Sequence, residues 1–357
     1  MHGDTRSRDG GALVSWSRRV LLVEQRAAHH AGASGYHRLA EYLERAVGAQ
    51  VVRHGFPARG TWRLVGPLVR RSRMAWYGPD TCLTELWAAT AAAWQGAILH
   101  FLEGENGYRY ASAMPGRRRR RIVATLHLPP SVFSEYVVPT HHLEQLDAVV
   151  LVARNQLPLL DHLRRRPVVH VVPHGIDVDF YSPPPARPSA GPCLFVGQWL
   201  RDFITLERVI ALVHDALPAV RFRLILPGAR VGAWSGRPGV QAEAGLDDVA
   251  LRQAYQEASL LVMPLEDCTA NNAILEAMAC GLPLVATDVG GVRDYVGEEC
   301  ARLTPGGSPE GMAQAIVELL QQPAVRDTMG RAARRRSEGF AWPRVASQMA
   351  AVYRSLM

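Results

Sequence analysis

The sequence predicts an α/β protein of two doubly wound domains. Its 357 residues are about twice a usual domain length of roughly 150 residues. Short apolar runs alternate with helical patterns, which is typical of parallel sheets covered by helices on both faces. One proline-dense segment, SPPPARPSAGP at 182–192, interrupts this alternation because it cannot form a helix or a central strand. We therefore expect one domain on each side of this linker.

The first domain is expected to span residues 18–181, after a polar tail at 1–17 that we expect to be disordered. Its apolar runs have the length of strands, and patterns with helical periodicity separate them. The expected strands are 20–23, 97–101, 122–126, 148–152 and 168–172, and the expected helices include 36–47 and 82–94.

The second domain is expected at 193–338, followed by a C-terminal helix at 339–357 that can pack back on the first domain. Strands again alternate with helices, so this sheet should also be parallel. The expected strands lie within 193–197, 221–228, 259–264 and 282–287, and the expected helices lie near 203–215, 248–257, 272–280 and 309–320.

The composition excludes several classes of chemistry. All 40 basic residues are arginine, which excludes lysine Schiff bases, lysine nucleophiles and lysine-containing phosphate loops. The formal charge of +7 and the isoelectric point near 9.5 favour anionic partners such as nucleotides or acidic lipids. The five cysteines lack CxxC spacing, which indicates reduced thiols. Because the sequence has neither a long uncharged apolar run nor a signal-peptide pattern, we expect a cytoplasmic protein.

The stretch DCTANNAILEAMACGLPLVATDVGG at 267–291 has the organisation of a phosphate-binding turn. It follows an apolar strand, and ligands bind beyond the carboxyl ends of strands in open α/β sheets. The helix that begins near Asn271 and Asn272 presents unpaired backbone N–H groups and a positive dipole end, which favour a phosphate. Glu276 lies in the second turn, where its carboxylate can accept hydrogen bonds from two ribose hydroxyls. The segment predicts a nucleotide-diphosphate cradle; the alternative is an ordinary amphipathic helix with a solvent-facing glutamate.

This stretch resembles the nucleotide-sugar site of retaining GT-B glycosyltransferases of the family-4 type, also called glycosyl transferases group 1. Three further segments resemble the same family in the same order: VVPHGIDVDFYSP at 171–183, FVGQW at 195–199 and LRQAYQEASLLVMP at 251–264. The resemblance extends over residues 18–355 and is strongest at 168–297. It implies two Rossmann-like domains, of which the first carries the acceptor and the second binds the nucleotide sugar.

The resemblance implies a hexosyltransferase-type enzyme that moves a sugar from a nucleotide-diphosphate donor to a hydroxyl of a glycan, lipid or small molecule. Transfer would occur with retention, without a metal ion and without a cofactor, since the donor is a substrate. The resemblance implies that the donor lies in a cleft between the two domains, with its ribose on Glu276 and its sugar near His127. We assign its diphosphate to the helix end at Asn271 and to Arg201, the nearby cation. The remaining candidates for donor contacts are Gly32, Ser34, Gly35, Gly197, Cys268 and Asn272.

One departure from the family pattern concerns the donor sugar. The family commonly has a second glutamate eight residues before the ribose-binding one, where this chain has Cys268. Glu266 or Asp267 can reach in from the same loop.

A second departure concerns the diphosphate. The arginine and lysine that usually clamp it are replaced by Gln198 and Phe203, which leaves Arg201 as the cation of that loop. A hydrogen bond to a charged group contributes about 1.5–3 kcal/mol, so donor binding should weaken unless another arginine takes over. The alternative function is therefore a non-catalytic GT-B scaffold that binds a partner or an anionic membrane.

Two features of the first half are candidates for the same site. Gly32, Ser34 and Gly35 lie in the loop after the first expected strand, where glycine allows close approach of a phosphate; the alternative is a plain connecting turn. His127 follows the strand 122–126 and is a candidate to bind the donor sugar or to move a proton; the alternative is a structural histidine.

Other charged residues are interpreted as structural or solvated. Glu103 and Glu105 are assigned to a solvated loop; the alternative is that they bind hydroxyls of the acceptor. The arginine run at 117–121 is a solvated loop or, alternatively, a peripheral contact with an anionic membrane. Because no aromatic residues interleave with it, nucleic acid is not predicted. The histidines at 170 and 174 and the aspartates at 177 and 179 have metal-ligand spacing but lie outside the donor loops, so no metal is predicted.

Overall fold

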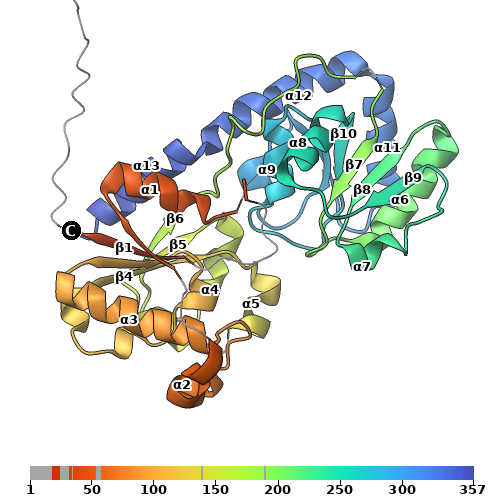
Figure 1. The fold of residues 1–357 in the computed structure, drawn as a ribbon. Coiled ribbons are helices and arrows are strands. Elements are labelled where there is room, and N and C mark those ends of the chain that lie inside the picture. The colour runs from red at the N-terminus through yellow and green to blue at the C-terminus, as the bar shows by residue number, and fades with distance from the viewer. Residues whose placement is uncertain (1–17, 25–31, 34, 54–57, 138–139, 189) are drawn as a thin grey trace, which may run out of the picture.

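A computed structural model describes residues 18–24, 32–33, 35–53, 58–137, 140–188 and 190–357, and it confirms the two α/β domains (Figure 1). The predicted tail at 1–17 and the candidate residue Ser34 lie outside the described residues. Each domain is built on one sheet of six parallel strands, with helices on both faces.

The first sheet has the strand order β2-β1-β3-β4-β5-β6. Helix α1 and the C-terminal helix α13 cover one face, because Leu39 and Val345 share a buried cluster with Leu22 of β1. Helix α3 covers the other face, where Ala89 packs in one cluster with Leu99 of β3. The strands are β1 (Val20–Glu24), β2 (Gln50–Arg53), β3 (Ile98–Phe101), β4 (Arg121–Leu126), β5 (Ala148–Leu151) and β6 (Val168–Val171). The helices are α1 (Arg38–Val47), α2 (Ala58–Ser72), α3 (Pro79–Gln95), α4 (Gly104–Gly107), α5 (Pro130–Tyr136) and α13 (Trp342–Arg354), with 3₁₀ turns η1 (Ala111–Ala113), η2 (Arg117–Arg119), η3 (His141–Gln145) and η4 (Arg154–Leu160).

The second sheet has the strand order β12-β11-β10-β7-β8-β9. The chain therefore reverses its direction of winding between β7 and β10, which are neighbours in the sheet. The strands are β7 (Cys193–Val196), β8 (Phe222–Ile225), β9 (Val240–Glu243), β10 (Leu260–Met263), β11 (Leu284–Thr287) and β12 (Ala301–Thr304). The helices are α6 (Phe203–Ala216), α7 (Gly228–Val231), α8 (Asp248–Glu257), α9 (Asn272–Ala279), α10 (Val292–Tyr295), α11 (Pro309–Gln321) and α12 (Pro323–Ser337), followed by the 3₁₀ turn η5 (Glu338–Phe340).

The sequence pattern finds the inner strands and misses three strands at sheet edges. β2, β9 and β12 each lie at the end of a sheet. Edge strands are short and carry polar side chains, so QVVR, VQAE and ARLT lack the continuous apolar run of a central strand. The pattern also misses α2, because Gly60, Gly66 and Pro67 interrupt its helical signal.

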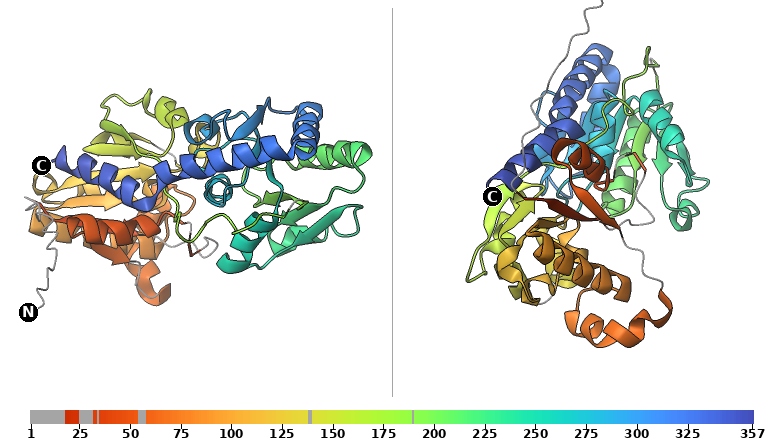
Figure 2. Two further views of the ribbon diagram at one scale, coloured as in Figure 1. Left: turned by 90° about the horizontal axis from the view of Figure 1, so that it is seen from above. Right: turned by 60° about the vertical axis from the view of Figure 1, so that its left-hand side comes forward.

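The chain passes between the domains twice, and the two crossing segments pair with each other. The Ile176 amide donates to the Phe340 carbonyl (2.9 Å), and the Trp342 amide donates to the Ile176 carbonyl (3.3 Å). The Trp342 indole packs so closely on the backbone of Gly175 that a Cβ there would lie 2.2 Å from the ring. After this point α13 runs along the first domain beside α1, while α12 lies on the second domain (Figures 1 and 2).

A buried histidine joins α13 to the first sheet. His100 of β3 hydrogen-bonds with the Tyr353 hydroxyl of α13 (2.7 Å) and with the Thr125 hydroxyl of β4 (2.8 Å). Because it is fully buried, the pKa of His100 falls to about 3. The imidazole is therefore neutral in the folded protein at neutral pH.

We expect Trp342→Ala to lower the free energy of unfolding by about 3–5 kcal/mol, because it removes a fully buried indole from the point where the crossing segments meet. Urea denaturation followed by circular dichroism measures this loss. The matched control is Trp94→Ala, which should change stability by less than about 0.5 kcal/mol because that side chain is 84% exposed. An equal effect of the two substitutions would contradict this assignment.

We also expect the free energy of unfolding to decrease as the pH is lowered below about 6.5, the ordinary pKa of histidine. The folded-state pKa of His100 is lowered to about 3, so between these two values the unfolded chain binds a proton that the folded chain does not. The contribution of His100 to the free energy of unfolding is thus fully present above the unfolded pKa. It decreases by about 1.4 kcal/mol per pH unit as the pH falls from the unfolded pKa towards the folded one. Urea denaturation at about pH 7 and about pH 5 should show a smaller loss for His100→Gln than for the wild type; equal losses would rule this group out.

Candidate functional site

Two loops of the second domain meet where its sheet changes winding direction, at the carboxyl ends of β7 and β10. Arg201, in the loop after β7, forms an isolated bridge with Leu265, in the loop after β10. The Leu200 carbonyl accepts a hydrogen bond from the Glu266 amide (3.0 Å). This switch point is where open α/β sheets bind their ligands.

Arg201 is the central cation of this region. Its guanidinium donates to the Val196 carbonyl (3.2 Å), the Trp199 carbonyl (2.8 Å) and the Asn271 side-chain oxygen (3.3 Å). Gly197 has a positive φ of 93°, and a Cβ there would lie 3.1 Å from the guanidinium, so the absence of a side chain lets the arginine pack on this turn. Burial lowers the pKa of Arg201 to about 10, and the group therefore keeps its positive charge at neutral pH.

The N-terminus of α9 lies beside this cation. Asn271 is its N-cap residue: the backbone is extended and the side-chain oxygen accepts from the Ile274 amide (3.3 Å). Asn272 begins the helix and is half-buried. The helix is buried from Ala273 to Ala279, so its positive dipole end and Arg201 act together in a region of low polarity.

Glu276 does not face solvent, since its side chain is only 3% exposed. The Tyr255 hydroxyl, from α8, donates to its carboxylate (2.7 Å). Burial, together with the charge of Glu276, raises the pKa of Tyr255 well above its ordinary value, so the phenol stays protonated and donates. An isolated buried carboxylate is unfavourable, and this hydrogen bond holds it in one orientation.

Cys268 lies in the loop between β10 and α9 as a buried, neutral thiol, because burial raises its pKa to about 12. Its carbonyl accepts from the Gly291 amide (2.8 Å) and from the Asn155 side chain of the first domain (2.9 Å). Of the two acidic residues that precede it, Glu266 is exposed, and Asp267 pairs with the Ser131 hydroxyl of the first domain (2.5 Å).

His127 lies across the domain interface from this loop. Its ring Nε2 lies 2.8 Å from the Leu102 carbonyl, which can only accept, so Nε2 carries the proton and Nδ1 is the acceptor of the neutral ring. Its backbone carbonyl accepts from the Thr269 hydroxyl of the second domain. The interpretation of Glu105 as a solvated loop residue is wrong: it is buried and accepts from the backbone amides of His127 and Leu128.

The glycine loop after β1 also reaches the second domain. The Ala33 amide donates to the Asp248 carboxylate at the start of α8 (2.9 Å), and a Cβ on Gly32 would lie 3.0 Å from the same carboxylate. Gly35 accepts from the Arg38 amide and so supports the first turn of α1. The structure thus brings Gly197, Arg201 and Asn271 into one cluster, and it joins His127 to the loop of Cys268 through Thr269.

Arg230 also lies in this region, although the sequence pattern did not predict it. It belongs to α7, after β8, and donates to the Gln198 side chain (3.3 Å). Its guanidinium also lies 4.5 Å from the centre of the Phe203 ring. Gln198 and Phe203 stand where the resembled family has the arginine and lysine that bind the diphosphate. Arg230 therefore places a cation beside both positions from α7.

The arginine run at 117–121 is largely structural, contrary to its interpretation as a solvated loop. Arg117 and Arg121 pair with Asp147, and Arg120 is fully buried against backbone carbonyls, including that of Pro115. The other two arginines of the run are exposed.

Metal-ligand clusters are absent from the residues that the structure describes. Asp177, of the spaced aspartate pair, accepts from the backbone amides of Asp179 and Phe180 and pairs with Arg38. Among the described helices, none is both long and apolar enough to cross a bilayer.

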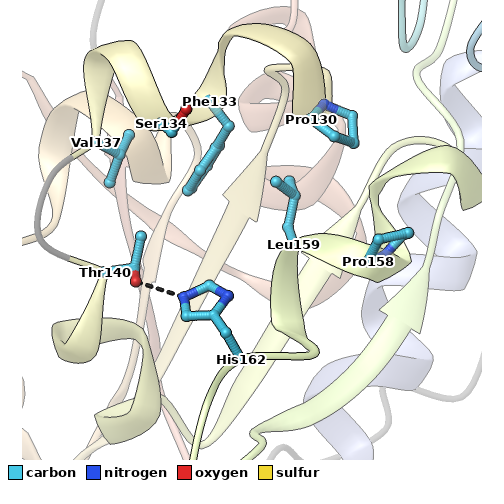
Figure 3. Close-up of a pocket in the computed structure, with 8 residues that line it drawn as sticks. All are labelled: Pro130, Phe133, Ser134, Val137, Thr140, Pro158, Leu159 and His162. Carbon is cyan, nitrogen blue, oxygen red and sulfur yellow. Dashed lines mark hydrogen bonds between the residues drawn. The ribbon is translucent and has the colours of Figure 1, made fainter.

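A pocket of about 430 Å³ lies on the first domain between α5 and η4 (Figure 3). Most of its lining is apolar, and Thr140 and His162 hydrogen-bond to each other at one side (Figure 3). Helix α5, which forms one wall, begins three residues after His127 and also carries Ser131, the partner of Asp267. The lining residues are Pro130, Phe133, Ser134, Val137, Thr140, Pro158, Leu159 and His162.

The second domain matches a family model, Glycosyl transferases group 1, over residues 193–322. The D-inositol 3-phosphate glycosyltransferase of Kineococcus radiotolerans is 31% identical over 223 residues, which are 52% of this chain and 51% of that protein. The protein of the same name from Kribbella flavida is 32% identical over 217 residues, with the same two shares. The chain therefore matches these curated relatives over about half of their length.

Solved structures are similar to the whole chain. Sucrose-phosphate synthase from Thermosynechococcus elongatus has a TM-score of 0.67 at 18% identity, over 95% of this chain and 99% of that one. HepE of Anabaena, solved in complex with UDP, has a TM-score of 0.68 at 16% identity, over 95% of this chain and 100% of that one. The chain thus has the GT-B fold of these structures, and residues 193–322 of its second domain match the glycosyl transferases group 1 model.

Proposed function

We propose that the protein is a retaining, hexosyltransferase-type glycosyltransferase that moves a sugar from a nucleotide-diphosphate donor to a hydroxyl acceptor. The observation that carries this proposal is the cluster at the switch point of the second sheet: a partly buried arginine at the N-terminus of α9, with a buried glutamate in the second turn of the same helix. In the proposal the diphosphate binds between Arg201 and the helix end, and the ribose hydroxyls bind Glu276.

This arrangement suits the charge that develops during transfer. Breaking the bond between sugar and diphosphate leaves additional negative charge on the phosphate oxygens. A helix dipole and a guanidinium that are already in place stabilise that charge more in the transition state than in the ground state. The proposed reaction requires no metal ion and no cofactor, and the leaving phosphate helps to deprotonate the acceptor hydroxyl.

The acceptor side is proposed to lie on the first domain. His127, with Nδ1 as its acceptor atom, would accept a hydrogen bond from a hydroxyl of the donor sugar. The pocket between α5 and η4 is lined by Pro130, three residues after His127 in the chain. Its mostly apolar lining suits an acceptor that has an apolar portion next to its reacting hydroxyl.

The similar proteins support a nucleotide-sugar donor. The curated relatives are named as glycosyltransferases, and HepE of Anabaena was solved with UDP and with UDP-glucose. UDP is therefore the first nucleotide to test. The non-catalytic scaffold remains the second candidate, because Cys268 stands where the family has a glutamate.

Two variants separate donor binding from transfer. We expect Glu276→Ala to weaken nucleotide binding by at least about tenfold, because a buried acceptor of two hydroxyls is lost. His127→Ala should instead lower the transfer rate while nucleotide affinity stays close to that of the wild type. Calorimetric titration with UDP, GDP, ADP and TDP, followed by donor hydrolysis assays with the matching sugars, measures both quantities.

The control for this pair is Glu310→Ala, which removes a glutamate in an exposed surface ion pair with Arg208. Wild-type rates and affinities in both site variants would refute the assignment. If wild-type protein binds none of the four nucleotides at millimolar concentration, the scaffold becomes the better account.

We further propose that Arg230 supplies the second cation for the diphosphate, in place of the clamp residues replaced by Gln198 and Phe203. Arg230→Ala should then weaken nucleotide diphosphate binding by about 10- to 100-fold, as expected for losing one hydrogen bond to a charged group. Arg237→Ala is the matched control, because Arg237 also stacks on an aromatic ring at 4.5 Å, that of Trp234. Equal affinities for the two variants would show that Arg230 does not contact the diphosphate.

A further inference from the structure

Three aromatic rings from the two domains meet beside the proposed donor site. In the first domain, Trp76 stacks on Tyr136 with ring centres 4.2 Å apart and planes at 16°. From the second domain, the Trp199 ring lies 5.9 Å from Tyr136 and 6.5 Å from Trp76. We refer to Trp76, Tyr136 and Trp199 as the aromatic bridge.

The backbone around Trp199 is strained in a way that fixes its direction. Leu200 has a positive φ of 52°, which is unfavourable for a residue with a bulky side chain. Such strain persists only where the surrounding structure holds it, and it is common at functional sites. The Leu200 carbonyl is held by the Glu266 amide. The turn thereby directs Trp199 to the first domain and Arg201 to β10 and α9.

Trp199 and Arg201 are also joined directly. The Arg201 guanidinium donates to the Trp199 carbonyl at 2.8 Å, while another of its nitrogens donates to Asn271 at the N-terminus of α9. The position of the Trp199 backbone therefore restricts where the arginine can place its charge.

The aromatic bridge is partly exposed to solvent. Trp76 is 42% exposed and Trp199 is 48% exposed even when the rings touch. Tilted aromatic pairs of this kind contribute modestly beyond the area that they bury. The neighbouring contacts between the domains include the hydrogen bonds of Ser131 with Asp267 and Asn155 with Cys268, and the ion pair of Arg154 with Asp294. An interface of polar contacts and half-exposed rings suits domains that open and close.

We propose that Trp199 is a positioning residue: when the domains close, its ring docks on Trp76 and Tyr136, and this docking fixes the 197–202 loop so that Arg201 binds the donor diphosphate. The inference rests on the proposed function. It adds that contact with the first domain raises the affinity of the second domain for its nucleotide. Trp76 itself belongs to the first domain and lies outside the proposed donor cradle. Its influence on nucleotide affinity therefore passes through Trp199.

A double-mutant cycle tests this coupling. The dissociation constant of the nucleotide diphosphate that the wild type binds, with UDP tried first, is measured by calorimetry for Trp76→Ala, Trp199→Ala and the double variant. We expect each single variant to bind about three- to tenfold more weakly. The double variant should bind no more weakly than Trp199→Ala, because both substitutions remove the same contact.

Two further variants separate positioning from general destabilisation. Trp199→Phe keeps an aromatic ring and should restore most of the affinity. Trp94→Ala removes a tryptophan that is 84% exposed on α3 and should leave the affinity unchanged. Wild-type affinity in Trp76→Ala, or effects of Trp76→Ala and Trp199→Ala that add in full, would overturn the inference while leaving the proposed function intact. A wild-type protein that binds no nucleotide would overturn both.

Discussion

The contact between the Trp342 indole and the backbone of Gly175 holds together the two segments by which the chain passes between its domains. Because the segments pair at Ile176 and Phe340, both crossings of the chain are held at the same place. The C-terminal helix then returns to the first domain, where His100 anchors it through Tyr353. With the crossings held at this point, the carboxyl ends of the two parallel sheets face each other, and the candidate residues lie in the loops and helices that follow those ends.

Burial of charge is the second constraint on the site. Glu276 is buried and Arg201 is partly buried, which is unfavourable for charged groups unless hydrogen bonds compensate. For Arg201 the partners are two backbone carbonyls and the cap residue Asn271, and for Glu276 a partner is Tyr255. These groups are oriented before any ligand arrives. A ligand that brings two phosphates and a ribose would therefore meet donors and acceptors that need little rearrangement, which is how preorganised sites gain affinity.

The parts of the fold that could be predicted are those with a local signature. Inner strands appear as continuous apolar runs, and the cap residue and buried helix at 271–279 appear as a local pattern of asparagines and apolar residues. The edge strands β2, β9 and β12 lack such a run, because one side of each is open to water and carries polar side chains, whereas the edge strand β6 keeps an apolar run and was predicted. Charged residues were harder still: Glu105 and Arg120 look solvated in sequence, yet both are buried, because backbone groups distant in the chain complete their hydrogen bonds.

The sequence by itself determined that there are two parallel α/β domains and that the stretch 267–291 forms the turn and helix of the candidate site, because these features depend on periodicity and on neighbours within a few residues. Only the tertiary structure decided which side chains meet. Arg230 of helix α7 contacts Gln198, 32 residues away in the chain, and Trp199 meets Trp76 and Tyr136 from the other domain. Such contacts leave no periodic trace in the chain, since they depend on the order of strands in each sheet and on how the two sheets face each other.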